Sequence, residues 1–221
     1  MPKHLQTEIE NLKKKILRLG ARVENAVREA AVSLEERDAA LAGQVIENDI
    51  EIDQAEVEIE EECLKILALH QPVAIDLRFI IAVLKINTDL ERIGDLAVNI
   101  AERAAFIATV PKVNVFFDFL TMAQKAQDML KKSLDALVQL NTKMARQVCA
   151  ADDEVDAINR QMYHLFKDAV RKNPNQIESL VHLLSASRHL ERIADHATNI
   201  AEDVIYMIDG QIVRHKTEIY N

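Results

Sequence analysis

Two stretches of this chain, 100 residues apart, carry the same oxygen-bearing side chains in the same order. Residues 90–102 read LERIGDLAVNIAE and residues 190–202 read LERIADHATNIAE, with ten of thirteen positions identical. The shared acids and amides are Glu91, Asp95, Asn99 and Glu102 in the first stretch and Glu191, Asp195, Asn199 and Glu202 in the second. Carboxylate and amide oxygens are the ligands that hard metal cations prefer. A repeat of this length indicates two versions of one structural unit.

The spacing of these residues places them on one face of a helix. At roughly 100° per residue, the side chains of Asp95, Asn99 and Glu102 fall within about 80° of Glu91. The opposite side of this helix is apolar and is expected to face the core. It carries Ile86, Leu90, Ile93, Ala97 and Ile100. Glu91 and Asp95 are like charges one turn apart, which costs roughly 0.2–0.5 kcal/mol. A bound cation would relieve that repulsion, and a solvent-exposed acidic face is the alternative.

A second pair of acids precedes each stretch. Asp49 and Asp53 in the first half align with Asp152 and Asp156 in the second, at an offset of 103 residues. We expect each acid pair and the stretch that follows it to lie on the two arms of an antiparallel helical hairpin. One hairpin turns at Gln71-Pro72 and the other at Asn173-Pro174-Asn175, because proline fits the first turn of a new helix.

Equal distances from the turn place these acids level with each other. Asp53 and Glu91 are each 19 residues from Pro72, and Asp49 and Asp95 are each 23 residues from it. In the second half, Asp156 and Glu191 are likewise equidistant from the peptide bond before Pro174, and so are Asp152 and Asp195. The first arm contains nine acids and no base between positions 47 and 62, so one of them could lie level by chance. The second half is less crowded, and its agreement therefore carries more weight.

Two sites built from oxygen ligands predict hard cations. Mg²⁺, Mn²⁺, Ca²⁺ or iron suit such ligands. Structural zinc prefers Cys or His, so Zn²⁺ is kept only as an alternative. A ferritin-like di-iron enzyme needs Glu-x-x-His on its helices, and none of the seven histidines has a Glu three residues before it. His189 and His196 flank only the second stretch, so we expect them to make local contacts. The predicted metal ligands are Asp49, Asp53, Glu91, Asp95, Asn99, Asp152, Asp156, Glu191, Asp195 and Asn199.

The composition predicts an all-α protein that does not bind nucleic acid. The chain has 221 residues, with only four Gly, four Pro and no Trp. Its net charge of −9 argues against neutralisation of nucleic-acid phosphates. Cys63 and Cys149 are far apart and indicate neither a disulfide framework nor a thiolate metal site. The N-terminus lacks the apolar segment of a signal peptide, and no apolar run could span a membrane, so a cytoplasmic location is expected.

Six long helices are expected, in two sets of three. Apolar spacing and helix breakers place them at about residues 5–34, 38–70, 72–109, 116–140, 141–171 and 175–209. Pro111 marks a linker, so residues 1–110 and 111–221 are predicted to form two three-helix bundles. The chain has no P-loop, GxGxxG or GxSxG motif and no nucleophile–base–acid set, so no catalytic residue is predicted.

The doubled LERIxDxxxNIAE motif resembles the PhoU family, as do QPVAIDLRF at residues 71–79 and RHLERIADHATNIAEDVIY at 188–206. The resemblance covers essentially the whole chain. It implies two tandem three-helix bundles related by pseudo-twofold symmetry, in a cytoplasmic protein that often forms a homodimer. It also implies metal clusters at paired E/DxxxD motifs, which here are the acids named above, with Asn99 and Asn199 extending each row.

The resemblance further implies a non-enzymatic regulator of phosphate homeostasis. Such proteins act with a phosphate ABC transporter, through its ATPase subunit, and with a phosphate-responsive sensor histidine kinase. They repress phosphate-starvation genes when phosphate is plentiful. Asp76 and Arg78 belong to a string that the second repeat lacks, so we predict that they contact a partner; a structural role at the hairpin tip is the alternative. The competing function is a metal-dependent phosphohydrolase, in which Arg92 and Arg192 lie beside the ligand rows.

Overall fold

The computed structural model describes residues 3–115 and 117–210, and every regular element in that part of the chain is helical. The elements are α1 (Lys3–Glu36), α2 (Ala39–Asn48), α3 (Ile50–His70), α4 (Ala74–Thr109), α5 (Phe119–Gln139), α6 (Thr142–Lys172), the short 3₁₀ helix η1 (Pro174–Gln176) and α7 (Ile177–Asp209). The prediction of an all-α fold is therefore confirmed. None of the helices in the described ranges combines the length and the apolar character that crossing a bilayer requires.

Polar side chains cap the starts of three helices, α2, α5 and α6, near their predicted positions. The side chain of Asp38 accepts hydrogen bonds from the backbone amides of Ala40 (2.9 Å) and Leu41 (3.0 Å), and α2 begins there. Asp118 caps α5 in the same way. The start expected for this helix, Phe116, lies outside the described residues. Side chains that satisfy the first free amides thus decide where these helices begin.

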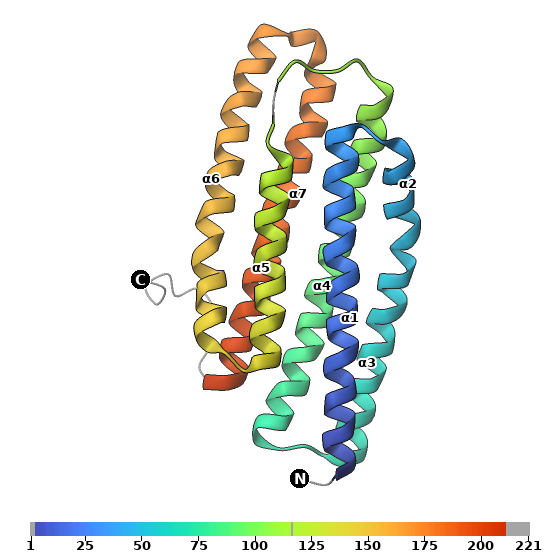
Figure 1. Ribbon diagram of the computed structural model, residues 1–221, viewed down its shortest axis with the longest axis vertical. Coiled ribbons are helices and arrows are strands. Elements are labelled where there is room, and N and C mark those ends of the chain that lie inside the picture. The colour runs from blue at the N-terminus through green and yellow to red at the C-terminus, as the bar shows by residue number, and fades with distance from the viewer. Residues whose placement is uncertain (1–2, 116, 211–221) are drawn as a thin grey trace.

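The second predicted helix, residues 38–70, is interrupted and forms α2 and α3. The break falls at Asp49, whose carbonyl accepts the amide of Ile52 (2.8 Å) as well as that of Asp53 (3.1 Å). The first of these bonds spans three residues, as in a tight 3₁₀ turn. Asn48 and Asp49 are weak helix formers, because their side chains compete for nearby backbone groups. The chain keeps its general direction through the break (Figure 1), so Asp49 stays on the predicted hairpin arm.

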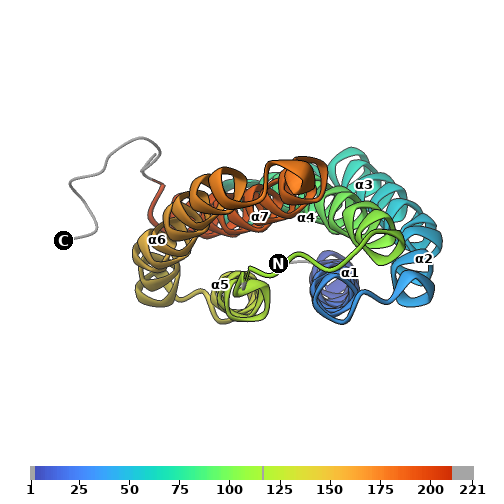
Figure 2. The same cartoon turned by 90° about the horizontal axis from the view of Figure 1, so that it is seen from above.

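Seen end-on, the helices form an arc with two further helices on its concave side (Figure 2). α6, α7, α4 and α3 follow one another along the arc, and α5 and α1 lie inside it. α4 and α7 pack together at the centre and run antiparallel. Near one end of this pair Lys85 forms an ion pair with Asp203 (3.2 Å), and near the other end Phe106 stacks on His182 (3.9 Å between ring centroids). The α4–α7 pair therefore joins the two halves of the chain.

One continuous cluster of buried apolar side chains extends through both halves. All five apolar positions predicted to face the core in the first repeated stretch, Ile86, Leu90, Ile93, Ala97 and Ile100, are completely buried. α1 and α5 approach closely at Gly20, where a Cβ atom would lie only 2.2 Å from Cδ1 of Leu134. The two halves therefore share a core. Their division between residues 110 and 111 stays a prediction, and residues 211–221 lie outside the described part.

Candidate metal centre

A glycine on α4 allows the first acid pair to approach this helix. A Cβ atom at Gly94 would lie 3.2 Å from Oδ1 of Asp49 and 3.2 Å from Cγ2 of Ile52. These distances are tight, so the α2–α3 junction sits almost directly against the α4 backbone. The carboxylate of Asp49 consequently lies beside Asp95, the residue that follows Gly94 in the chain. The equivalent position of the second repeat is Ala194.

We call Asp49, Asp53, Glu91 and Asp95 the first carboxylate row, and within it the pKa values of Asp49 and Glu91 are raised. Burial is the main cause that raises the pKa of Asp49 to about 6, and the charges of Asp53 and Asp95 add to it. The pKa of Glu91 is also raised, by burial first and then by Asp95, and Asp53 contributes. The structure thus brings together both pairs that their distances from Pro72 placed level, because the two arms rise equally per residue.

Asp152, Asp156, Glu191 and Asp195 form the second carboxylate row, with the same electrostatic pattern. Burial, followed by the charges of Asp195 and Asp156, raises the pKa of Asp152 to about 6. Desolvation and Asp195, then Asp156, raise the pKa of Glu191. The pKa of Asp195 is raised by the same loss of hydration and by Asp156. Each acid therefore lies near its predicted level partner in this repeat as well.

One arginine contacts the first row, and a backbone carbonyl engages its amide. Arg92 contacts both Glu91 (3.4 Å) and Asp95 (3.2 Å), which partly neutralises them. The side-chain amide of Asn99 donates a hydrogen bond to the carbonyl oxygen of Asp95 (2.7 Å), within its own helix. Asn199, its counterpart on α7, is exposed. The amides therefore extend each row along the helix, and Asn99 does so with its nitrogen committed to the backbone.

The side chains have a donor chemistry that fits a hard cation, but they do not close around one. Within residues 3–115 and 117–210, no three His, Cys, Asp or Glu side chains converge in a way that could hold a metal ion. In the second row, Arg160 pairs with Asp156 (3.3 Å). Metal binding would therefore require the arginines to leave and the carboxylates to rotate inward. The raised pKa values of Asp49 and Asp152 show that negative charge is unfavourable here and that a cation would relieve it.

The family model of the PhoU domain matches this chain twice, at residues 16–104 and 119–204. The chain belongs to the PhoU family. A relative from Aquifex aeolicus (strain VF5), called phosphate-specific transport system accessory protein PhoU homolog, is 38% identical over 209 residues, which is 95% of each chain. A homolog of the same name from Pseudomonas aeruginosa is 37% identical over 209 residues, or 94% of this chain and 86% of its own.

Two solved PhoU structures have the same fold. The crystal structure of PhoU from Pseudomonas aeruginosa superposes with a TM-score of 0.89 at 36% identity, covering 93% of this chain and 99% of that one. The phosphate transport system regulatory protein PhoU from Streptococcus pneumoniae gives a TM-score of 0.83 at 29% identity, covering 95% and 99%. These comparisons confirm the family and the helical bundle that the repeated motif indicated.

In this PhoU-family chain, three polar residues near the rows escaped the sequence analysis. Glu56 lies close enough to Asp53 for its pKa to be raised, with burial and Glu60 as the larger causes. Asn159, which occupies the position equivalent to Glu56, and the hydroxyl of Thr198 instead favour the ionised forms of neighbouring acids. Aligning the two repeats at the offset of 103 residues would have shown that Glu56 and Asn159 occupy equivalent positions. The first row consequently has one more acidic side chain beside it than the second row has.

The two residues predicted to contact a partner have different surroundings. Nε of Arg78 donates a hydrogen bond to the carbonyl of Met207 in the last turn of α7 (2.9 Å). Arg78 therefore links the two halves, which gives it a structural role beyond the hairpin tip. Asp76 lies in the first turn of α4, where a negative charge suits the helix dipole. Contact of either residue with a partner stays a prediction.

Of the two histidines beside the second motif, His189 makes a local contact as expected, whereas His196 contacts the other half of the chain. Nδ1 of His196 lies 2.8 Å from Oδ1 of Asp89, across the α4–α7 contact. Nε2 of His189 lies 3.2 Å from the hydroxyl of Ser185. Burial, with the nearby Arg103 next, lowers the pKa of His189 to about 4, so this ring is neutral at physiological pH. His196 thus bonds across the contact between the halves, and His189 bonds within α7.

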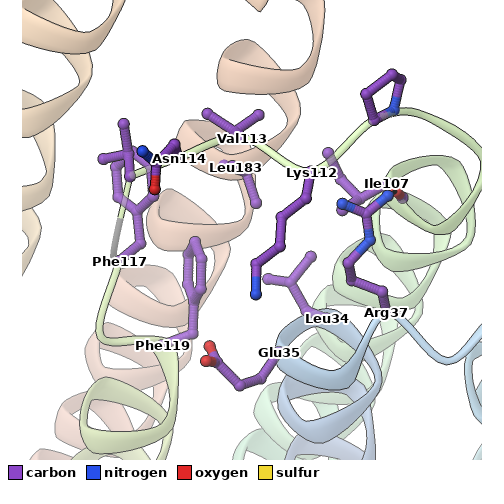
Figure 3. Close-up of a pocket in the computed structure, with 12 residues that line it drawn as sticks. Leu34, Glu35, Arg37, Ile107, Lys112, Val113, Asn114, Phe117, Phe119 and Leu183 are labelled. Carbon is purple, nitrogen blue, oxygen red and sulfur yellow. Dashed lines mark hydrogen bonds between the residues drawn. The ribbon is translucent and has the colours of Figure 1, made fainter.

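Two cavities show where a small ligand could enter. A cavity of about 240 Å³ lies under the linker, and Figure 3 shows Lys112 extending into it beside Phe119 and above Glu35. It contains none of the row carboxylates. A groove of about 320 Å³ on α6 and α7 lies beside the second row. It is lined by Asn159, Arg160, Tyr163, His164, Leu184, Arg188 and Glu191. Of these two cavities in the described part of the chain, only the groove combines a row carboxylate with two arginines.

Proposed function

We propose that this chain regulates phosphate uptake as an adaptor protein without enzymatic activity. The observation that carries the proposal is similarity to proteins named for the phosphate-specific transport system, over 95% of the chain in the Aquifex aeolicus case. In this role the protein is cytoplasmic. It binds the ATPase subunit of a phosphate ABC transporter and a phosphate-responsive sensor histidine kinase. It represses phosphate-starvation genes when phosphate is plentiful, and it forms a homodimer.

The two carboxylate rows are the proposed metal sites. Asp49, Asp53, Glu91, Asp95 and Asn99 hold the metal in the first repeat, and Asp152, Asp156, Glu191, Asp195 and Asn199 hold it in the second. Hard divalent or trivalent ions, such as Mg²⁺, Mn²⁺, Ca²⁺ or iron, suit these oxygens better than Zn²⁺ does. When bound, the ion supplies positive charge that offsets the repulsion between the acids. The raised pKa values of Asp49 and Asp152, which come from burial and then from neighbouring acids of the same row, support this assignment.

Genetic complementation tests the regulatory role. The chain is expressed in a bacterium that lacks its own phosphate-transport accessory protein, and a phosphate-starvation promoter drives a reporter. We expect repression in phosphate-rich medium and release from repression when phosphate is limiting. Purified ATPase subunit and sensor kinase, immobilised separately, should each retain the chain. A folded protein that neither restores repression nor binds either partner would contradict the proposal.

A metal-dependent phosphohydrolase is a second candidate, favoured by one observation. The groove beside Glu191 places Arg160 and Arg188 next to an acid of the second row, as a phosphate ester would require. Hydrolysis of a chromogenic phosphate monoester should be measured with each metal found in the native protein. Turnover that is lost in Glu191→Gln and reduced in Arg188→Ala would support the enzyme. Equal background rates of hydrolysis in the wild type and in both variants would rule out the phosphohydrolase.

A further inference from the structure

The outer side of α2 and α3 carries four large apolar side chains that the described chain leaves in solvent. Ile46, Ile50, Val57 and Leu64 are 37%, 60%, 51% and 54% exposed. The spacing of seven residues places Ile50, Val57 and Leu64 within about 40° of one another on α3, and Ile46 precedes them on α2, before the break at Asp49. Together they form one continuous line, which we call the α3 stripe.

The α3 stripe lies at the end of the molecular arc. α3 packs against α4, α1 and α2, and α2 packs against α4, α1 and α3. In Figure 2 these two helices form one end of the arc, and no other element of the described chain lies beyond them. The opposite side of α3 is filled with buried residues such as Ile52, Ile59 and Ile66. The stripe is therefore a second apolar face, turned away from the core.

The second repeat shows that packing does not require three of the four stripe residues. At the offset of 103 residues, the positions of Ile50, Val57 and Leu64 are taken by Asp153, Arg160 and Lys167, all exposed. The buried faces nevertheless agree, because Val155, Met162 and Ala169 occupy the places of the three buried isoleucines of α3. The same helix in the same fold tolerates charges on its outer side. Exposed apolar side chains at these positions thus indicate contact with something outside the chain.

Negative charge surrounds the α3 stripe on both sides. Residues 47–62 contain nine acids and no base. On the helical wheel Asp53 and Glu60 flank the stripe on one side, and Glu47, Glu58 and Glu61 flank it on the other. Two ion pairs of this segment lie toward α1, where Lys15 contacts Glu62 (3.8 Å) and Arg22 contacts Glu51 (3.6 Å), and Lys65 of α3 also contacts Glu62 (3.4 Å). The acids next to the stripe therefore define a negative rim around an apolar centre.

We propose that the α3 stripe is a docking surface for a basic amphipathic α-helix of a partner protein. The stripe spans residues 46–64, which corresponds to about 27 Å of helix. A partner helix of similar length could cover it with its apolar face, while its Lys and Arg residues meet the acidic rim. This inference rests on the proposed adaptor role only for the biological source of that helix. It adds the chemistry of the partner and the site where the partner binds.

The acidic rim argues against the other occupants of an apolar face. A second copy docked through the same surface would bring its acidic rim against this one, since a twofold contact pairs identical surfaces. Bacterial membranes with anionic lipids would repel the rim for the same reason. A basic helix is the occupant whose charge complements the rim at every turn of the stripe.

A designed peptide tests the proposal directly. The probe is a fluorescein-labelled helix of about 18 residues, with Leu on one face and Lys on both flanks. Its binding to the full-length protein is followed by fluorescence anisotropy. We expect Val57→Gln with Leu64→Gln to weaken binding about tenfold or more, because two apolar contacts are lost. The matched control is Ile177→Gln with Val181→Gln on α7, whose wild-type side chains are 51% and 50% exposed. This control should bind like the wild type.

Three further measurements decide among the occupants. A twin peptide with Glu in place of Lys should not bind, and salt should weaken binding of the Lys peptide because it screens the rim. Equal binding by the stripe variant and the control variant would overturn the proposal. Loss of self-association in the stripe variant, seen by sedimentation without any peptide binding, would make the surface a contact between copies and also overturn it. Preferential binding to anionic vesicles would do the same. None of these results depends on the transporter or kinase, so the proposed function is tested separately.

Discussion

At the scale of single residues, Asp49 and Asp152 occupy equivalent places and have the same perturbed acidity. Each has its pKa raised to about 6 by burial and by neighbouring acids. The two environments differ in detail, since Thr198 opposes the rise at Asp152. The same perturbation arises in both repeats because each hairpin places an acid from one arm against two others. These two aspartates are therefore the most informative positions at which to test the carboxylate rows.

The first prediction concerns the stability of the chelator-treated protein as a function of pH. Because the pKa of each aspartate is higher in the folded state than in the unfolded state, the folded state holds its protons more tightly. Stability from these two groups is therefore present at acidic pH and is lost as pH rises from about 4 through about 6. Asp49→Asn with Asp152→Asn removes these partly buried charges and should raise the Tm at pH 7.5. The rise should be only about 2–4 °C, because solvent already screens part of the repulsion.

Thermal melts from pH 4.5 to 7.5 check this prediction. The difference between the variant and wild type is the quantity to compare, because His189 acts in the opposite sense. Its pKa of about 4 means that its contribution is lost as pH falls from about 6.5 toward 4. A variant that melts at or below the wild-type temperature at pH 7.5 would show that the aspartates are not repelled.

The second prediction concerns metal content. Asp49→Ala with Asp95→Ala should remove metal from the first carboxylate row and leave the second row loaded, because the rows lie on separate hairpins. Elemental analysis of the purified variant should then find about half of the wild-type metal if both rows bind alike. Loss of all metal from a folded variant would contradict two independent sites. The mirrored variant, Asp152→Ala with Asp195→Ala, provides the matched control.

At the scale of helices, the hydrogen bond from Arg78 to the end of α7 changes what a substitution should do. Sequence alone predicts that Arg78→Ala leaves the Tm nearly unchanged and weakens binding to one partner. The contact with the carbonyl of Met207 shows that the guanidinium satisfies a helix end in the other half of the chain. We therefore expect Arg78→Ala to destabilise the fold by about 1–2 kcal/mol.

Chemical denaturation measures this loss, with Asp76→Ala as the control from the same turn. The control should change stability much less, since Asp76 only complements the helix dipole. Partner binding can then be compared well below the unfolding transition. If Arg78→Ala binds normally there and is merely less stable, its role is structural. An unchanged free energy of unfolding would mean that the bond to Met207 contributes little in solution.

At the scale of the whole molecule, the buried core does not depend on the carboxylate rows. One apolar cluster runs through both halves, and the rows lie outside it. The α4–α7 pair holds this core together through contacts such as those of Lys85 with Asp203 and His196 with Asp89. Folding free energy therefore comes mainly from burial, and a bound metal adds only its preference for the native state.

The final prediction is that a chelator leaves the protein folded. The helical circular dichroism signal at 25 °C should be unchanged, and the Tm should fall by an amount that depends on free metal concentration. Re-addition of the metal should restore the original Tm. Complete loss of the helical signal on chelation would instead make the metal a requirement for folding, as it is in small zinc modules.

The sequence by itself determined the repeated unit, the helices and the level placement of the acids. These follow from local rules, because an apolar stripe fixes which side of a helix faces the core. Two antiparallel arms rise equally per residue, so distance from Pro72 was enough to pair Asp49 with Asp95 and Asp53 with Glu91. The break at Asp49 was missed because weak helix formers interrupt a helix only in some contexts.

Only the tertiary structure decided how the two halves meet and which surfaces remain uncovered. The bond between His196 and Asp89 and that between Arg78 and Met207 join positions more than 100 residues apart. Such contacts depend on the rotation and spacing of packed helices, which periodicity does not specify. The α3 stripe is exposed for the same reason. Its residues are apolar in any register, and only the packing of α2 and α3 at the end of the arc leaves them in solvent.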